Sequence, residues 1–187
     1  MNTIVVLVER PRKSKRIVER IARGLEATTL CADVFCVPKE KAKAMAMVVE
    51  RLGGSMLILD KSEGSGLGLV IGVVKDFSRF IRYTLVQALK YGAMYIPTPT
   101  RRGCAAVLFP SHNDAVRFVE RERAAVQILE LKVVGSYTPL RLRDQSEVAR
   151  LIRVLPRLAE FRAIMRKAFV DLEYLESRWS SFLSSHE

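Results

Sequence analysis

The chain has 187 residues, 49% of them hydrophobic, which is enough for one domain with a real core, or one domain with an extension. Its formal net charge of +11 favours nucleic acid or another anionic partner, although a basic surface that only faces solvent would give the same charge. Apolar runs are too short to span a bilayer and the N-terminus has no signal-peptide pattern, so we expect a soluble, cytoplasmic protein without a membrane partner.

The first apolar run, residues 3–8, predicts a buried strand. The basic segment ERPRKSKR follows, and its Pro11 suits the first position of a helix that we expect to extend to about Leu25. Lys13, Arg16, Arg20 and Arg23 would form a basic stripe on that helix. Helix starts favour acidic residues, so these cations either are solvated or bind an anion.

The next segments predict a strand over 31–37 and a helix starting at Pro38, with Lys39, Lys41 and Lys43 in its first turns. Its expected apolar face is Ala42, Met45, Val48, Val49 and Leu52. Strands at 55–60 and 67–74 flank a glycine-rich turn at 61–66. Because GSGLG leads into a strand rather than a helix, it is a poor nucleotide-binding fingerprint.

Farther along, the pattern predicts a helix over 77–90 capped by Asp76, a loop over 93–103 and a strand over 105–109. A helix capped by Ser111 should follow over about 112–124. The segments 126–134 and 138–144 alternate and are expected to form a hairpin through Gly135. The order helix, strand, turn, strand at 38–74 and at 111–143 suggests a repeated topology.

The C-terminal segment has apolar residues every three to four positions from 151 to 182, which predicts one long helix that Pro156 kinks or restarts. That helix could pack on its own domain, which we favour, or on a partner helix.

The cysteines Cys31, Cys36 and Cys104 contain no CxxC pair. We therefore expect buried free thiols rather than a disulfide or a zinc site. The chain has two histidines, so no metal site and no cofactor are expected.

Two family resemblances begin at VERPRKSKRI, residues 8–17. The segment resembles the opening of Toprim domains, where a glutamate ends the first strand and a later Asp-x-Asp pair completes a Mg²⁺ site. That resemblance would assign Glu9, Asp60 and Glu63 to a metal-dependent nucleic-acid enzyme. The second aspartate is absent, and Lys61 stands beside Asp60, where it would repel a metal.

The closer resemblance is to the Brix-domain family of ribosome-biogenesis proteins, especially its short archaeal members. It rests on VERPRKSKRI, on VPKEK, on LILDKSEGSGLGLVI (57–71) and on ILELKVVGSYTPLRLRD (128–144), in order along residues 3–144. The resemblance implies an α/β sandwich of two similar halves, with mixed sheets and packed helices. It also implies a non-catalytic, RNA-binding role in rRNA processing or ribosomal subunit assembly.

The expected organisation is therefore a Brix-like α/β domain over 1–144 and a helical extension over 145–187, with rRNA or pre-rRNA as partner. Assembly proteins could dock on the 151–182 helix, which would make the chain a protein-interaction module. Strand-borne Arg141 and Arg143 would point the same way. The expected RNA contacts are Arg10, Arg12, Lys13, Lys15, Arg16, Arg20, Lys39, Lys43, Lys61, Arg101, Arg102 and Arg141.

Overall fold

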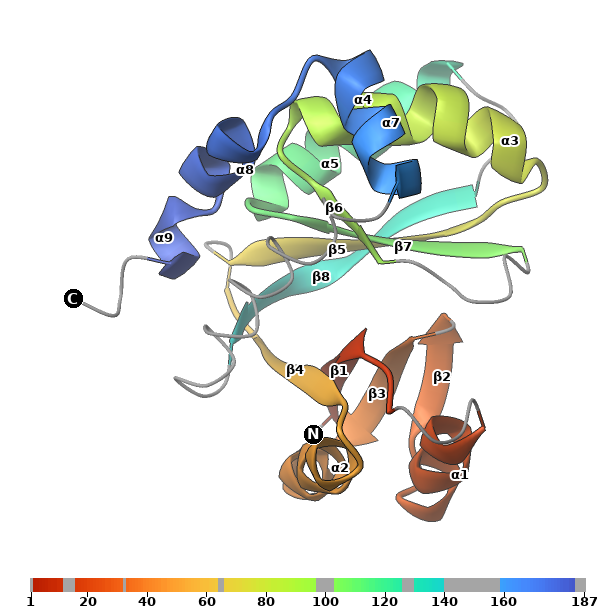
Figure 1. The fold of residues 1–187 in the computed structure, drawn as a ribbon, viewed down its shortest axis with the longest axis vertical. Helices are drawn as coiled ribbons and strands as arrows, with labels where there is room; N and C mark the ends of the chain where they lie inside the picture. The colour runs from red at the N-terminus through yellow and green to blue at the C-terminus, as the bar shows by residue number, and fades with distance from the viewer. Residues whose placement is uncertain are drawn as a thin grey trace.

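The computed structural model describes residues 2–11, 16–31, 33–63, 66–96, 103–125, 130–139 and 159–183. It is an α/β fold in which eight strands form one sheet in the order β2-β3-β1-β4-β8-β5-β7-β6 (Figure 1). Each neighbouring pair of these described strands is antiparallel. The expectation of an α/β fold is confirmed, but that of mixed sheets is wrong. Strands β1 and β2 run the same way, yet β3 lies between them and pairs with both.

The chain forms two halves with the same order of elements. The first half consists of β1 (Asn2–Glu9), α1 (Ile17–Gly24), β2 (Thr28–Cys31), β3 (Val34–Pro38), α2 (Lys39–Arg51) and β4 (Ser55–Lys61). The second consists of β5 (Leu67–Val73), the helix α3–η1–α4 (Phe77–Arg79, Phe80–Thr84, Leu85–Lys90), β6 (Met94–Ile96), β7 (Cys104–Phe109), α5 (His112–Ala125) and β8 (Glu130–Pro139). The strand orders β2-β3-β1-β4 and β6-β7-β5-β8 correspond position by position. The topology is therefore repeated, as expected, but the repeating units cover residues 2–61 and 67–139 rather than 38–74 and 111–143.

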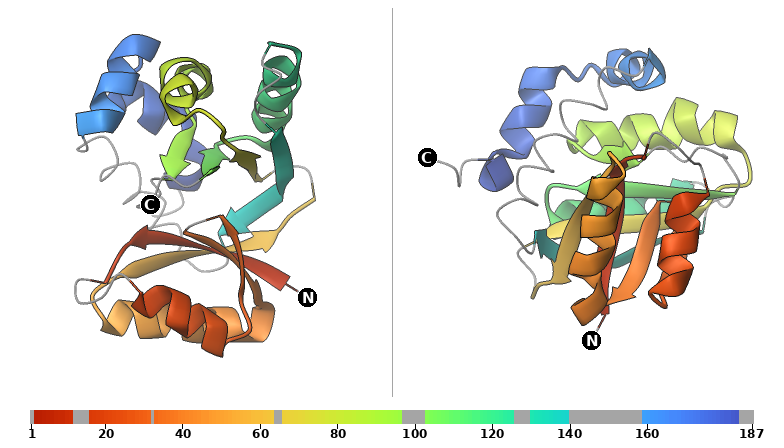
Figure 2. Two further views of the ribbon diagram at one scale, coloured as in Figure 1. Left: turned by 90° about the vertical axis from the view of Figure 1, so that its right-hand side faces the viewer. Right: turned by 60° about the horizontal axis from the view of Figure 1, so that its bottom comes forward.

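The two half-sheets face each other, and each carries its helices on the outside (Figures 1 and 2). Successive side chains of a strand point to opposite faces of the sheet, so each strand can pack against helices on one face and against the other half on the other face. On β1, Val5 and Leu7 pack with α1 and α2, whereas Ile4 and Val6 join a core shared with the second half. The half-sheets are joined through pairing of the last residues of β4 with the end of β8, from Leu59↔Pro139 to Lys61↔Tyr137.

A disulfide between Cys31 of β2 and Cys104 of β7 links the two halves, so the expectation of three free thiols is wrong. Cys36 is the free cysteine and is half-buried. The two bonded residues are 73 positions apart, and only the facing of the half-sheets brings them together.

The N-terminal elements differ from expectation in two places. Helix α1 begins at Ile17, and Pro11 lies in no helix. A Cβ on Gly54 would stand 3.0 Å from Pro11 Cδ, so Pro11 packs closely beside the start of β4. The strand expected at 31–37 is instead two strands, β2 and β3, because the chain reverses between Cys31 and Val34.

Strand β8 replaces the expected hairpin. It passes through Gly135 without turning, and an irregularity in its register against Leu69 and Val70 accommodates an extra residue. The segment 140–144 lies outside the described residues.

Strand β6 lies in the stretch expected to be a loop and pairs with β7. The caps expected at Asp76 and Ser111 are present: Asp76 Oδ1 accepts from Arg79 N at 3.1 Å, and Ser111 Oγ accepts from Asp114 N at 3.5 Å.

The described part of the C-terminal segment, residues 159–183, contains three short helices, α7 (Ala159–Ala168), α8 (Leu172–Arg178) and α9 (Ser180–Leu183), rather than one long helix. The chain turns at Phe169, whose φ is 55°, and Asp171 then caps α8 by accepting from Tyr174 N at 2.8 Å. The expected seam packs on the chain's own second half: Phe161, Met165, Ala168, Leu175 and Trp179 are buried there. Leu151, Val154, Pro156 and Leu158 lie outside the described residues.

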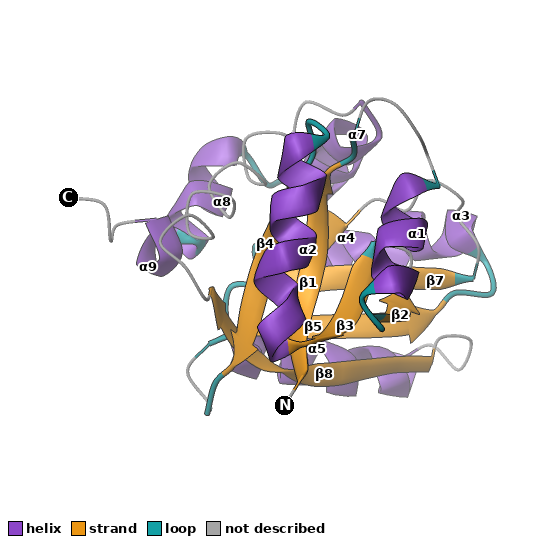
Figure 3. Ribbon diagram, turned by 90° about the horizontal axis from the view of Figure 1, so that it is seen from below, coloured by secondary structure: helices purple, strands orange, loops and turns teal. Residues whose placement is uncertain are grey.

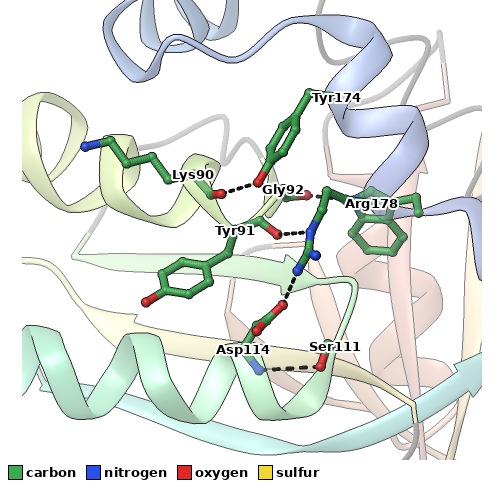
Figure 4. A network of polar contacts seen from close by, with 8 residues as sticks. Lys90, Tyr91, Gly92, Ser111, Asp114, Tyr174 and Arg178 are labelled. Carbon is green, nitrogen blue, oxygen red and sulfur yellow. Dashed lines mark hydrogen bonds and ion pairs between the residues drawn. The ribbon is translucent and has the colours of Figure 1, made fainter.

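Side chains of α8 and the following turn fasten this segment to the end of α4 (Figure 4). Tyr174 donates to the carbonyl of Lys90, Arg178 to that of Tyr91, and Trp179 to that of Gly92. Arg178 also pairs with Asp114 of α5. The docked position of α8 is therefore specified by polar contacts as well as by burial.

Candidate nucleic-acid interface

Helices α1 and α2 lie side by side on the outer face of the first half-sheet (Figure 3). Val18 and Ala22 of α1 are buried beneath them, as are Ala42, Met45, Ala46 and Val49 of α2. The polar faces of both helices are consequently turned outward. We call this surface the α1/α2 layer; its exposed cations are Arg16, Arg20, Arg23, Lys39, Lys43 and Arg51.

The two helices run in opposite directions. Helix α2 starts where Pro38 lies opposite Asn2, and α1 starts at the other end of β1, beyond Pro11. An ion pair of 2.9 Å between Lys41 Nζ and Glu26 Oε2 joins the first turns of α2 to the end of α1. The Lys41 hydrogen bond and charge lower the pKa of Glu26.

The expected contacts are therefore spread along the layer rather than gathered at one point. Arg10 and Arg16 lie toward one end, whereas Lys39 and Lys61 lie toward the other. The 13 residues of α2 extend over roughly 20 Å. A partner that contacts both ends must be extended over a comparable length.

Arg10 has a structural role. Its guanidinium pairs with Asp33, whose side chain is 7% exposed, at the turn between β2 and β3. Burial raises the pKa of Asp33 to about 6, and the charge and hydrogen bond of Arg10 oppose that rise. The pairing partly neutralises the Arg10 charge.

The lysines at the other end differ in their partners. Lys39 Nζ lies 2.8 Å from Asp60 Oδ2, so its charge is partly balanced. Lys43 and Lys61 are exposed, as is Lys39. Lys43 lies one turn after Lys39 on α2 and shares its face.

Six of the expected contacts lie outside the described residues: Arg12, Lys13, Lys15, Arg101, Arg102 and Arg141, as does Arg143. Conversely, Arg51 was missed in the sequence, because it follows the apolar stretch of α2 rather than a helix start. The sequence does indicate its position, because Arg51 lies eight residues after Lys43 and this spacing places both residues near the outward face of the helix.

The Toprim-like carboxylates do not converge. Glu9 lies opposite Ser55, at the start of β4, whereas Asp60 lies five residues farther along the same strand. At strand rise their backbones are roughly 17 Å apart, too far to share a Mg²⁺ ion. Asp60 is instead paired with Lys39. Within the described ranges, no group of His, Cys, Asp and Glu side chains is placed to hold a metal ion.

The outer helices of the second half carry further cations that the sequence interpretation did not single out. Exposed members are Arg79, Arg82, Lys90, Arg117 and Arg121; Lys75 precedes α3, and Arg162, Arg166 and Lys167 lie on the adjoining α7. Beneath them Glu122 of α5 is buried, which raises its pKa, while Arg121 and a hydrogen bond with Thr84 lower it. Both outer faces of the molecule thus carry exposed cations. No helix among the described residues is long and apolar enough to cross a membrane.

No protein-family model matches the chain, and no curated protein matches it significantly.

Proposed function

We propose that this chain is a non-catalytic, RNA-binding factor in ribosome assembly, and that its α1/α2 layer contacts the phosphate backbone of structured rRNA or pre-rRNA. The observation that carries the proposal is the set of six exposed cations on two adjacent helices (Figure 3): Arg16, Arg20, Arg23, Lys39, Lys43 and Arg51. Cations attract phosphate without regard to sequence, and their number sets the salt dependence of binding.

The nature of the layer favours backbone contacts over base stacking. Its exposed large apolar residues are Met47 and Val48, and neither α1 nor α2 contains an aromatic residue. Single-stranded bases stack mainly on aromatic side chains, which both helices lack, whereas duplex RNA is recognised through its phosphates and shape. A structured RNA with a duplex segment is the best match.

The assignment to ribosome assembly rests on the Brix resemblance. The two halves with corresponding strand orders support it, because that resemblance implies a sandwich of two similar halves. The basic residues in the opening segment support it as well.

The two alternative functions have less support. A Toprim-type enzyme needs Glu9 and Asp60 together, and they lie at opposite ends of the β1–β4 pair. A protein-interaction module on the 151–182 seam needs an exposed apolar face, and the described seam residues are mostly buried in the chain's own core.

The proposal is tested by measuring binding to structured rRNA fragments and to length-matched duplex DNA, with and without Mg²⁺. We expect RNA to bind more tightly than DNA and to remain intact in Mg²⁺. Equal affinity for both would indicate non-specific charge attraction, and Mg²⁺-dependent cleavage that disappears in Glu9→Ala would favour the enzyme instead.

A further inference from the structure

Phe169 is exposed at a position where a large side chain has no evident structural use. It follows the last residue of α7 and is 95% exposed, the largest exposure among the described large hydrophobic residues. Its φ of 55° lies in the left-handed region, which is costly for a bulky residue. The chain therefore accepts both backbone strain and an exposed aromatic ring at this position.

The local hydrogen bonds show what the backbone requires. Phe169 N donates to Arg166 O at 3.2 Å, and Val170 N donates to Met165 O at 3.0 Å. This is the Schellman ending of a helix, in which glycine is the usual residue at the left-handed position.

Other helices of the chain end with the same pair of bonds. At the ends of α2 and α4 the left-handed residues are Gly53 and Gly92. At the end of α1 the residue is Glu26, which forms the ion pair with Lys41. Phe169 differs from all three, since it is not a glycine, it carries no charge that could form an ion pair, and its ring buries almost nothing.

The surroundings of Phe169 indicate the charge of its partner. The exposed side chains described on α7 are Arg162, Arg166 and Lys167, together with Ala163. The first acidic residue after Phe169 is Asp171, which is used as the cap of α8. A ligand extending from Phe169 along α7 would therefore meet only cations and alanine among the described exposed side chains of that helix.

We propose that Phe169 stacks on an unpaired RNA base, and that Arg162, Arg166 and Lys167 contact the phosphates next to that base. This inference rests on the proposed function, because it takes RNA as the ligand. It adds a second contact of a different kind: α1 and α2 bind duplex backbone, whereas the end of α7 binds a single-stranded loop or bulge. An aromatic ring gains from base stacking when it is open to solvent in the free protein.

The test uses two RNA probes with the same stem, one closed by an unpaired loop and one a blunt duplex. Replacement Phe169→Gly should weaken binding of the loop probe about fivefold or more and change the duplex probe less than twofold. It should also raise the melting temperature, because glycine relieves the strained φ. Weaker binding thus cannot come from unfolding. Tyr83→Ala is the matched control, since Tyr83 is 62% exposed on η1 and should affect neither probe.

Two further variants separate stacking from simple apolar contact. Phe169→Trp should retain loop binding, and the fluorescence of the new indole should be quenched by the loop probe but not by the duplex. Phe169→Leu should bind the loop probe as weakly as Phe169→Gly. Full binding by Phe169→Leu, or unchanged loop binding by Phe169→Gly, would overturn this inference and leave the α1/α2 proposal intact. Absence of binding to either RNA by the native protein would overturn both.

Discussion

The indole N–H of Trp179 donates to the carbonyl oxygen of Gly92 at 2.7 Å, and the ring is fully buried. Together with Tyr174 and Arg178, it occupies three successive carbonyls, those of Lys90, Tyr91 and Gly92. Carbonyls at a helix end have no partner within the helix, so these side chains satisfy acceptors that α4 leaves open. The C-terminal segment is thereby part of the second half's core.

Replacing Trp179 should destabilise the whole protein. Trp179→Ala removes a large buried side chain and should cost about 3–5 kcal/mol of unfolding free energy. Trp179→Phe keeps much of the volume but leaves the Gly92 carbonyl without its donor, which should cost about 1–3 kcal/mol. Urea denaturation followed by circular dichroism measures both. Leu172→Ala, at a partly exposed position, is the control and should change stability by less than about 0.5 kcal/mol. An effect of that small size in Trp179→Ala would contradict the docked arrangement.

The disulfide should contribute to stability by restricting the unfolded chain. Closing a loop of 73 residues corresponds to about 4 kcal/mol in the chain-entropy treatment. A reductant should therefore lower the urea midpoint of the native protein, and Cys31→Ala should lower it similarly. In Cys36→Ser the effect of the reductant should persist. Peptide mapping without reductant should recover Cys31 joined to Cys104; a bond involving Cys36 would contradict the facing of β2 and β7.

Asp33 predicts a pH dependence of stability with a definite sign. Its pKa in the folded protein is about 6, above the ordinary value near 3.8, so the folded state binds this proton more tightly than the unfolded state. Stability from this group is therefore present at low pH and falls as the pH rises from about 4 to about 6.

The measurement compares urea denaturation of the native protein and Asp33→Asn across that range. The unfolding free energy of the native protein, relative to that of Asp33→Asn, should fall by about 1–3 kcal/mol between pH 4 and pH 6. Parallel pH profiles in the two proteins would show that Arg10 fully compensates the burial of Asp33.

Two glycines should respond oppositely to alanine. A Cβ at Gly68 would lie 2.5 Å from Ala115 Cβ, so Gly68→Ala must push α5 away from β5 and should cost about 1–3 kcal/mol. A Cβ at Gly24 would meet nothing within 4 Å at the end of α1, and Gly24→Ala should be neutral or stabilise by up to about 1 kcal/mol. Equal effects of the two substitutions on the urea midpoint would contradict the close approach at Gly68.

Much of the local structure follows from periodicity. The apolar patterns of helix α2 and strands β4, β5 and β7 predict bounds close to those observed, because each pattern has a clear start and end. Periodicity is less exact about which residues of a helix are buried. Val48 was expected on the apolar face of α2 but is exposed, whereas Ala46 is buried, because the sheet beneath the helix decides which side chains are covered.

Other features depend on contacts between distant residues. The unbroken apolar spacing of 151–182 predicts one helix, but Phe169 adopts a left-handed conformation that residue type disfavours. The pairing of Cys31 with Cys104 requires the two half-sheets to face each other, and no local pattern shows that. The basic residues are recognisable from composition, yet their separation along the α1/α2 layer follows from the antiparallel direction of the two helices.

The proposed role of the α1/α2 layer depends on whether its cations contact RNA phosphates, and the salt dependence of binding tests this most directly. The triple variant Arg20→Ala, Arg23→Ala, Lys43→Ala should bind duplex-containing rRNA fragments more weakly than the native protein. The slope of log K against log salt should become shallower by roughly one unit for each phosphate that no longer has a cation beside it. The matched control, Lys75→Ala with Arg117→Ala, removes exposed cations of the second half and should keep the native slope. An unchanged slope in the triple variant would contradict the proposal.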